Sequence, residues 1–506
     1  MTDNPNILFI QVDQLTAFAL KAYGDEVCHS PNLDNLAENG VVFENAYCNF
    51  PLCAPSRFSM ATGQLCSKVG AYDNGAEFPA SIPSYAHYLR ASGYQTSLSG
   101  KMHFIGPDQF HGFEKRLTAD LYPADFAWLA NWDGEGKRDT NDERGILTAG
   151  VCERSVQLDF DNEVTHCAVQ NVYDMARSDD RRPFFMQVSY THPHDPFLCE
   201  QKYWDLYEDK EIPLPRVGYM EEDQHDKHSL RILAEFGLVG KKFDDNDVLR
   251  ARRGYYGSVS YIDAQIGELL SALKATGYDQ NTVIVFTSDH GEMLGEKGLW
   301  FKKTLHEPAL RVPLFIYAPW IGGQRVSEGV SLVDLLPTFC SFANIELTAD
   351  CVEQLEGMDL CKLIDKGDPE PGRSVYVEYL AESTSAPIFV IRKGRYKFIH
   401  SIADGCRLYD LTNDPDELVN LIEDQAHQDT VTGFRTEAQA KWDGQELGCR
   451  IRLSQKRRIM IRNAMKQGDE VRWNHGEQPY QHVRWYRGKG SYNDWAFDYL
   501  PPASTE

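Results

Sequence analysis

Three runs of consecutive apolar residues constrain the fold of this chain more than any other feature. They are Ile7 to Val12, Phe184 to Tyr190 and Thr282 to Thr287. A continuous run of this kind is typical of a strand that is buried on both faces of a parallel sheet. Before the third run, Asp247 to Gly277 repeats apolar side chains at helical spacing. Alternating helices and buried strands predict an α/β fold with a doubly wound, mostly parallel sheet.

Polar residues follow each run at its carboxyl end. Asp13 follows the first run, His194 the second, and Asp289 with His290 the third. The ligand sites of open α/β sheets lie at this edge. Asp13 by itself is equally well explained as a helix cap. The prolines on either side of His194 fix its loop, which suits a proton donor better than a core histidine.

Two more polar residues, Lys101 and His103, follow a predicted strand from Tyr94 to Leu98. If the backbone stays extended there, both side chains point to the same side. Either one could instead be an ordinary surface residue. The next segment, from about Gly106 to Gln157, has little periodicity, and we predict insertions over the sheet edge that help to build a pocket.

The stretch Cys53-Ala-Pro-Ser-Arg57 predicts a loop that enters a helix, with Pro55 at a first helical position. A nucleophile at Cys53 would then face the free backbone N–H groups of the helix, where negative charge is stabilised. The alternative is that Cys53 is a small buried hydrophobic residue, as most isolated cysteines are.

Asp13, Asp289, His290 and Cys53 together suggest a metal site. Carboxylates with one imidazole suit a single divalent cation, and Ca²⁺ or Mn²⁺ fits them better than a tetrahedral Zn²⁺. The sequence offers no second cluster of histidines and carboxylates, which argues against a two-metal phosphatase. We expect one metal ion that polarises an oxygen of the substrate.

The length of 506 residues predicts a large domain and a smaller one. We place the boundary near Pro371, with a catalytic domain at 1–371 and a C-terminal α+β subdomain at 372–506. In the second part we predict a strand at Arg373 to Tyr379, a hairpin at Ile388 to Ile399 and a turn leading into a helix at Cys406 to Leu421. The tail from Trp473 to Tyr499 is expected to close a pocket or to embrace a neighbouring subunit.

The net charge of −24 argues against nucleic acid and anionic membrane surfaces as partners, because both would repel the chain. No apolar stretch is long enough to span a bilayer, and the first residues lack the pattern of a signal peptide. The 12 cysteines are scattered singly. We therefore expect mostly free thiols and a cytoplasmic protein.

Cys53-x-Pro-Ser-Arg57 followed by Thr62-Gly63 resembles the signature of type I sulfatases. The resemblance to the sulfatase branch of the alkaline phosphatase superfamily covers nearly the full length, and it is closer still to choline sulfatases. The strings that carry it include Val12-Asp-Gln14, Tyr72-Asp-Asn74, Leu98-Ser-Gly-Lys-Met-His103, Tyr122-Pro-Ala-Asp-Phe126, Thr191-His-Pro-His-Asp-Pro196 and Gly298-Leu-Trp-Phe-Lys302.

The resemblance implies an alkaline-phosphatase-like fold and a modified nucleophile. In the family, a separate maturing enzyme oxidises the cysteine that corresponds to Cys53 to formylglycine. The hydrated aldehyde has two hydroxyl groups: one attacks sulfur, and deprotonation of the other expels sulfate, which serine or cysteine could not do.

The resemblance also implies roles for particular residues. It implies metal binding by Asp13, modified Cys53, Asp289 and His290; support of formylglycine by Arg57; sulfate binding by Lys101 and Lys302; proton transfer by His103 and His194; and a substrate pocket lined by Asn74, Trp128, Glu382 and, more loosely, Asp494. The alternative for Trp128 is a packed aromatic residue. Two departures stand out: Gln14 and His290 replace an aspartate and an asparagine of many sulfatases, and Asn141-Asp-Glu143 stands where the family has a histidine-containing segment.

From these observations we expect a sulfuric ester hydrolase that converts choline-O-sulfate to choline and sulfate, as a homo-oligomer. The nearest alternatives are a phosphonate monoester or phosphodiester hydrolase and an aryl sulfatase of the same superfamily. A more distant alternative is a binding protein without catalytic activity, in which Cys53 stays unmodified.

Overall fold

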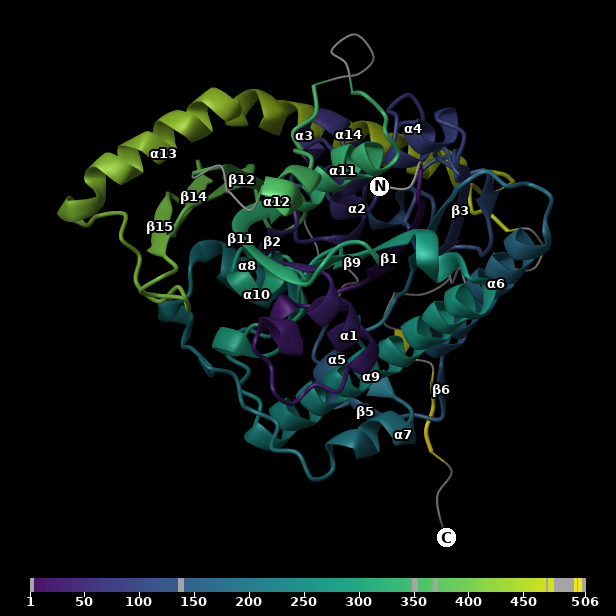
Figure 1. Ribbon diagram of the computed structural model, residues 1–506. Coiled ribbons are helices and arrows are strands. Elements are labelled where there is room, and N and C mark those ends of the chain that lie inside the picture. Colours follow the sequence, from purple (N-terminus) through teal and green to yellow (C-terminus); the bar gives the residue numbers. More distant parts are fainter. Residues whose placement is uncertain are drawn as a thin grey trace.

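The computed structural model describes residues 4–134, 141–347, 354–366, 372–469, 472–476, 496–497 and 499–502 (Figure 1). Its centre is an eight-stranded sheet in the order β11-β2-β10-β9-β1-β7-β3-β4. The strands are β1 (Asn6–Val12), β2 (Val41–Tyr47), β3 (Gln95–Gly100), β4 (Lys115–Arg116), β7 (Phe184–Ser189), β9 (Thr282–Ser288), β10 (Leu314–Tyr317) and β11 (Gln324–Ser331). Only β10 runs antiparallel to its neighbours, β2 and β9. The mostly parallel sheet predicted from the sequence is confirmed.

Strand β1 shows why both faces of the sheet are covered. Its side chains alternate, so that Ile7 and Phe9 belong to one buried cluster while Leu8 and Ile10 belong to another. Helices on one face supply the partners of the first cluster, and helices on the opposite face supply those of the second. Because no face of β1 meets water, its continuous apolar run is the pattern that this position requires.

The helices divide between these two faces. One face carries α1 (Pro31–Asn39), α6 (Val156–Arg177) and α9 (Asp245–Thr276), and α6 and α9 pack against each other (Figure 1). The other carries α2 (Cys53–Thr62), α4 (Tyr85–Ala91) and α11 (Leu335–Phe342). Further helices are α3 (Cys66–Val69), α5 (Arg144–Leu147), α7 (Gln201–Trp204), α8 (Lys227–Phe236), α10 (Glu307–Leu310) and α12 (Cys361–Lys366).

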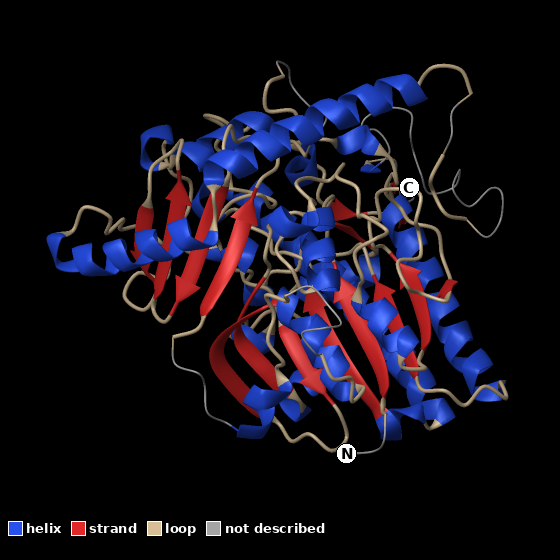
Figure 2. Cartoon of the chain, turned by 90° about the horizontal axis from the view of Figure 1, so that it is seen from above, coloured by secondary structure: helices blue, strands red, loops and turns tan. Residues whose placement is uncertain are grey.

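A second sheet lies beside the first (Figure 2). It is antiparallel, in the order β12 (Ser374–Tyr379), β13 (Ile388–Lys393), β14 (Tyr396–Ser401) and β15 (Arg407–Asp410), and is accompanied by α13 (Gln428–Lys441) and α14 (Gly444–Met465). Its apolar residues share one buried cluster with the central sheet. The predicted strand and hairpin are confirmed.

The prediction of a turn and helix at Cys406 to Leu421 is wrong. The segment begins with strand β15, whose Leu408 is buried against the sheet, and continues as turns. The side chain of Asp410 accepts the N–H of Thr412, and its backbone carbonyl accepts the N–H groups of Asn413 and Asp414. These hydrogen bonds bend the chain away from the strand. Asp and Asn side chains favour such turns over helix interiors.

Short pairings complete the fold. Strand β5 (Gly150–Val151) pairs with β8 (Leu198–Cys199), and β6 (Arg154–Ser155) pairs with β16 (Tyr499–Leu500), which brings part of the C-terminal tail back to the start of α6. Within the described residues, none of the helices combines the length and apolar character needed to cross a bilayer. The 11 cysteines in the described ranges are all unpaired, as predicted.

Candidate active site

Four neighbouring strands deliver polar residues to the same edge of the central sheet. The register pairs Val12 of β1 with Ser288 of β9, so the next residues, Asp13 and Asp289, lie side by side. On the other side, Gly100 of β3 pairs with Ser189 of β7, and both strands end there. Lys101 and the loop that carries His194 therefore start at the same edge as the two aspartates.

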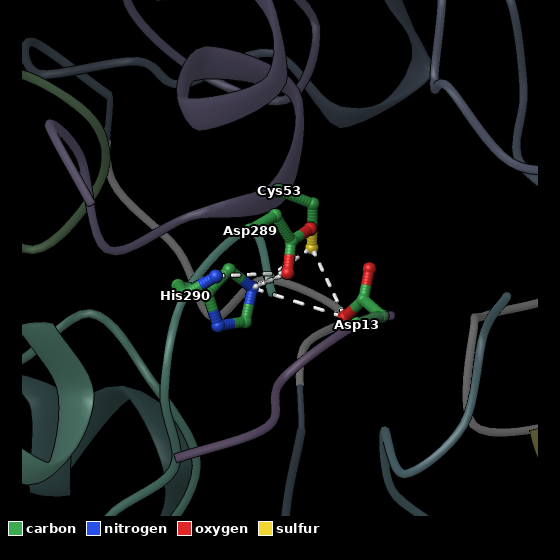
Figure 3. Close-up of side chains that lie close together, drawn as sticks. All are labelled: Asp13, Cys53, Asp289 and His290. Atoms are coloured by element: carbon green, nitrogen blue, oxygen red, sulfur yellow. Dashed lines mark hydrogen bonds and ion pairs between the residues drawn. The ribbon is translucent and has the colours of Figure 1, made fainter. Parts of the chain in front are cut away.

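Cys53 joins this edge as the first residue of α2. Its Sγ atom lies 3.3 Å from His290 Nε2 and 3.9 Å from Asp13 Oδ1. Figure 3 shows the four side chains of Asp13, Cys53, Asp289 and His290 pointing toward one another. The predicted helix start is confirmed, although Pro55 occupies the third helical position instead of the first.

Arg57, one turn further along α2, holds both aspartates. Its Nη2 donates to Asp13 Oδ2 at 2.9 Å, and its Nε donates to Asp289 Oδ2 at 2.8 Å. All three side chains are fully buried. Each carboxylate thus turns its Oδ2 toward Arg57, and each Oδ1 lies 3.8 Å from His290 Nε2.

The four clustered residues could hold a divalent cation. One ligand atom from each lies within 4.8 Å of the others, and all four side chains are buried. Burial raises the pKa of Asp289 to about 6 against the opposing effect of Arg57. Burial would lower the pKa of His290, but Asp289 and Cys53 raise it to about 9. Because a cation would keep the carboxylates ionised and the imidazole neutral, the donor set fits a metal ion.

Positive charge surrounds the Cys53 thiol. Burial and the carboxylate of Asp13 would raise its pKa, but Lys101 and His290 outweigh them and hold the pKa of Cys53 well below its usual value. The Lys101 ammonium is itself paired with Asp13 and lies 3.8 Å from the centre of the Tyr122 ring. An anion at the start of α2 would therefore be stabilised by these cations as well as by the helix end.

His103 packs against Tyr122, with 5.0 Å between the ring centres. Its backbone has a φ of 57°, so the chain is not extended there and the condition under which Lys101 and His103 would point to the same side is not met. Asp120 accepts the N–H groups of Met102 and His103, which turns the chain. Burial, aided by Lys101, lowers the pKa of His103 to about 4. Neither ring nitrogen has a hydrogen-bond partner among the described residues. The structure thus places a buried imidazole, without a hydrogen-bond partner in the described part of the chain, beside Tyr122.

His194 and Lys302 are in direct contact. His194 Nδ1 lies 2.7 Å from the carbonyl oxygen of Asp195, and its Nε2 lies 2.6 Å from Lys302 Nζ. A carbonyl can only accept, so Nδ1 carries the proton and Nε2 accepts from the ammonium. Lys302 also donates to Gln14 Oε1 at 2.6 Å. A proton can pass from Lys302 Nζ to His194 Nε2 along this contact.

Four further residues around this pair, Gln14, Asn141, Asp195 and Glu292, were not assigned a role from the sequence. Gln14 Nε2 donates to Asp195 Oδ1 at 3.3 Å and to Glu292 Oε2 at 2.5 Å. Asn141 Nδ2 donates to Asp195 Oδ2 at 2.6 Å. Gln14 and Asn141 had been noticed only as departures from the sulfatase pattern, and those departures were the available signal. Both hold Asp195, which shapes the loop of His194.

The residues predicted to line a substrate pocket are placed in three ways. Trp128 is half-buried and meets the rings of Tyr122 and His103 edge-on, at 4.9 and 5.4 Å. Asn74 accepts the N–H of Ala54, next to Cys53, at 3.0 Å. Glu382 is ion-paired with Lys303 at 2.6 Å, one residue beyond Lys302. Asp494 lies outside the described residues.

Comparisons with known proteins agree with this geometry. The family model for sulfatases matches residues 5–345, and that for the C-terminal part of N-sulphoglucosamine sulphohydrolase matches residues 295–442. The chain is 42% identical to the choline-sulfatase of Rhizobium meliloti over 489 residues, which cover 95% of this chain and 94% of that protein. It is 30% identical to the arylsulfatase of Clostridium perfringens over 475 residues, with coverages of 88% and 95%.

Solved structures support the fold. The phosphonate monoester hydrolase of Agrobacterium radiobacter aligns with a TM-score of 0.68 at 23% identity, covering 86% of this chain and 95% of that one. The sulfatase match begins just before β1 and extends past β11, so it contains the whole central sheet and the clustered residues. The chain belongs to the sulfatase family.

Proposed function

We propose that this sulfatase-family hydrolase converts choline-O-sulfate to choline and inorganic sulfate. The observation that carries the proposal is the 42% identity to a choline-sulfatase over nearly the whole of both chains. The aromatic wall of Tyr122 and Trp128 supports it, because a quaternary ammonium cannot donate hydrogen bonds and is bound by aromatic faces, at about 0.5–2 kcal/mol per contact.

Cys53 would serve as the nucleophile after a maturing enzyme has oxidised it to formylglycine. The hydrated aldehyde supplies one hydroxyl group for attack on sulfur and a second whose deprotonation releases sulfate. Support comes from the position of Cys53 at the start of α2, with Arg57 one turn away and Lys101 nearby. Both cations would stabilise negative charge on the attacking oxygen.

One divalent metal ion, with Ca²⁺ or Mn²⁺ as candidates, would be held by Asp13, the residue derived from Cys53, Asp289 and His290. When bound, such an ion polarises a substrate oxygen and lowers the pKa of a hydroxyl group beside it. Arg57 would keep the two carboxylates in register through its two hydrogen bonds. Hydrogen bonds of this kind orient the carboxylates that would bind the metal.

Lys101 and Lys302 would bind the sulfate oxygens, and His194 with Lys302 would protonate the leaving alcohol. An alkyl alkoxide is a poor leaving group, so its protonation matters more than for an aryl ester. The contact between His194 Nε2 and Lys302 Nζ at 2.6 Å supports a shared role in this step. His103, which stays neutral above a pKa of about 4, would accept a hydrogen bond or a proton from the nucleophile.

A phosphonate monoester or phosphodiester hydrolase is the second candidate, because the Agrobacterium radiobacter enzyme shares the fold. An aryl sulfatase is a third. The test is a direct assay of purified, metal-loaded protein on choline-O-sulfate, 4-nitrophenyl sulfate and a 4-nitrophenyl phosphonate. The proposal predicts the highest kcat/KM for choline-O-sulfate. Faster turnover of the phosphonate, or no turnover of choline-O-sulfate, would contradict it.

We further propose that the protein works in the cytoplasm as a homo-oligomer. The unpaired state of the 11 cysteines in the described ranges supports a reducing compartment. The oligomer rests on the resemblance to choline sulfatases, and most of the tail that would mediate it lies outside the described residues. Light scattering on the purified protein tests the oligomer, and an average mass of one chain would exclude it.

A further inference from the structure

Helix α14 reaches the active-site loops through a buried ion pair. Arg458 donates from Nη1 to Asp73 Oδ1 at 2.6 Å and from Nη2 to Asp73 Oδ2 at 2.9 Å. The two side chains are 6% and 0% exposed, although 385 positions separate them in the chain. Two parallel hydrogen bonds fix orientation as well as distance, so the pair holds Asp73 rigidly against α14.

Asp73 begins a tight loop that contacts the start of the nucleophile helix. Its Oδ1 also accepts the N–H of Gly75 at 2.9 Å, so the same carboxylate shapes the loop and binds Arg458. Between them, Asn74 accepts the N–H of Ala54 at 3.0 Å, and Ala54 directly follows Cys53. The position of Asn74 therefore depends on the orientation of Asp73.

The same loop packs against the segment that carries Trp128. A Cβ atom on Gly75 would lie 2.4 Å from the Leu129 nitrogen and 2.8 Å from the Trp128 carbonyl carbon. The two backbones are thus in direct contact, and neither can shift without displacing the other. Only glycine permits this approach.

Two more residues of α14 hold the chain just beyond Trp128. Gln455 Oε1 accepts the N–H of Trp132 at 2.9 Å, and Arg452 Nε donates to Asp133 Oδ1 at 3.2 Å. Positions 452, 455 and 458 recur every three residues and so share one side of the helix. That side of α14 contacts both the Asp73 loop and the chain just beyond Trp128.

We propose that Arg458 is a positioning residue for catalysis: through Asp73 it fixes Asn74 against the start of α2 and fixes the Asp73 to Gly75 loop against Trp128. It acts through these residues and not by contact with the substrate. The proposal rests on the proposed function, because it takes Cys53 as the site of the nucleophile and Trp128 as part of the wall on the alcohol side.

A double-mutant cycle in kcat/KM tests it, with Arg458→Met, Asn74→Ala and the double variant assayed on choline-O-sulfate and 4-nitrophenyl sulfate. A small displacement of catalytic groups costs up to about 100-fold, so we expect Arg458→Met alone to lower kcat/KM by roughly 10- to 100-fold. In the Asn74→Ala background, the same substitution should cost less than about threefold, because residues that act through one another are not additive. Additive losses would overturn the proposal.

Matched variants separate positioning from folding. Arg457→Met changes the neighbouring arginine, which is exposed, and should leave kcat/KM within about twofold of wild type. Arg458→Lys keeps the charge but loses the two-pronged contact, and should fall between wild type and Arg458→Met. Gly75→Ala disturbs the loop without removing any charge and should raise KM for choline-O-sulfate more than KM for 4-nitrophenyl sulfate. Should Arg458→Met fail to fold, these last two variants carry the test, and wild-type kinetics in both would overturn the proposal.

Failure of this proposal can be distinguished from failure of the proposed function. If wild type hydrolyses 4-nitrophenyl sulfate but not choline-O-sulfate, the substrate assignment fails, while the cycle on the aryl ester still decides the role of Arg458. A readout without turnover is the rate at which iodoacetamide alkylates Cys53 in protein purified without a maturing enzyme. We expect faster alkylation in Arg458→Met and an unchanged rate in Arg457→Met; equal rates in wild type and Arg458→Met would overturn the proposal.

Discussion

The charged cluster around Cys53 and the aromatic wall around Trp128 are neighbours in the structure, but the chain builds them in different ways. The cluster comes from strand ends and one helix start, whose positions follow from the register of the central sheet. The wall comes from loops, and contacts of Trp132 and Asp133 with α14 hold the chain just beyond Trp128. In the proposed reaction, rigid elements would therefore position the reacting groups, whereas the loops would surround the alcohol.

The difference suggests separate roles for the charged cluster and the aromatic wall. Groups that must meet a developing charge need fixed positions, which strands and helices provide. Loops tolerate sequence change and so set substrate choice within one family. We therefore expect substitutions in the cluster to abolish turnover of every substrate, and substitutions in the wall to change the preference among alcohols.

The largest effect is expected for Cys53→Ser. A serine can accept the sulfuryl group but cannot expel sulfate, so turnover should fall by at least about a thousandfold on every ester, after a burst of alcohol that matches the enzyme concentration. Rapid-quench kinetics measures the burst. Cys66→Ser is a matched control, because Cys66 is buried and donates to the Pro55 carbonyl, a contact that serine can keep. Steady turnover by Cys53→Ser near the wild-type rate would remove the distinction between cluster and wall.

The next effect concerns the metal. Asp13→Ala and Asp289→Ala should each lose bound metal and activity together, since each removes one of four clustered ligands. Elemental analysis of the purified variants measures the metal content. Asp263→Asn provides the control, because Asp263 is buried but binds the start of α1 at Leu33, away from the cluster. Full metal occupancy in either alanine variant would show that the ligand set is wrong.

Substitutions at Trp128 in the wall and at Glu382, which was also predicted to line the substrate pocket, should have a smaller and more selective effect. We expect Trp128→Ala and Glu382→Ala to raise KM for choline-O-sulfate roughly tenfold, as for one or two lost cation contacts, and to change aryl sulfate hydrolysis much less. Glu382 is paired with Lys303 in the structure, so its variant also tests whether that pair opens for the substrate. Steady-state kinetics on both esters gives the comparison. Equal losses would mean that these residues support the fold and not the choice of alcohol.

The smallest effect is on acid stability. Burial, against the opposing effect of Asp226, lowers the pKa of His228 to about 4, and its Nε2 contacts the carbonyl of Lys303 at 2.8 Å. Between pH 6.5 and 4 the unfolded chain binds a proton at His228 that the folded chain does not, so stability is present at higher pH and is lost as the pH falls. His228→Gln should reduce this slope by about 1.4 kcal/mol per pH unit. Urea unfolding at several pH values measures it, and an unchanged slope would exclude a neutral, buried His228.

The contrast between the charged cluster and the aromatic wall also explains what could be predicted from the sequence. Asp13, Asp289 and His290 were predicted because they stand at the carboxyl ends of apolar runs, and parallel strands end at a common edge. Cys53 was predicted from a short local pattern. These features need no knowledge of how distant segments meet, which is why the sequence was sufficient for the fold class and for the members of the cluster.

The remaining contacts depend on which distant segments of the chain come together in the fold. Lys302 reaches Gln14 across 288 positions, and Arg458 reaches Asp73 across 385, and no periodicity in the sequence indicates either contact. The error at Cys406 to Leu421 has a local cause, because Asp and Asn side chains that could start a helix instead form turns after β15. Loop conformation and long-range hydrogen bonds were thus beyond the patterns that predicted the cluster.

The most direct test of the account is peptide mass spectrometry over Cys53, combined with activity, on protein made with and without a maturing enzyme. The account predicts that the peptide carries an aldehyde in place of the thiol in active preparations, and that kcat rises in proportion to the modified fraction. Full activity in protein whose Cys53 remains a thiol would contradict it.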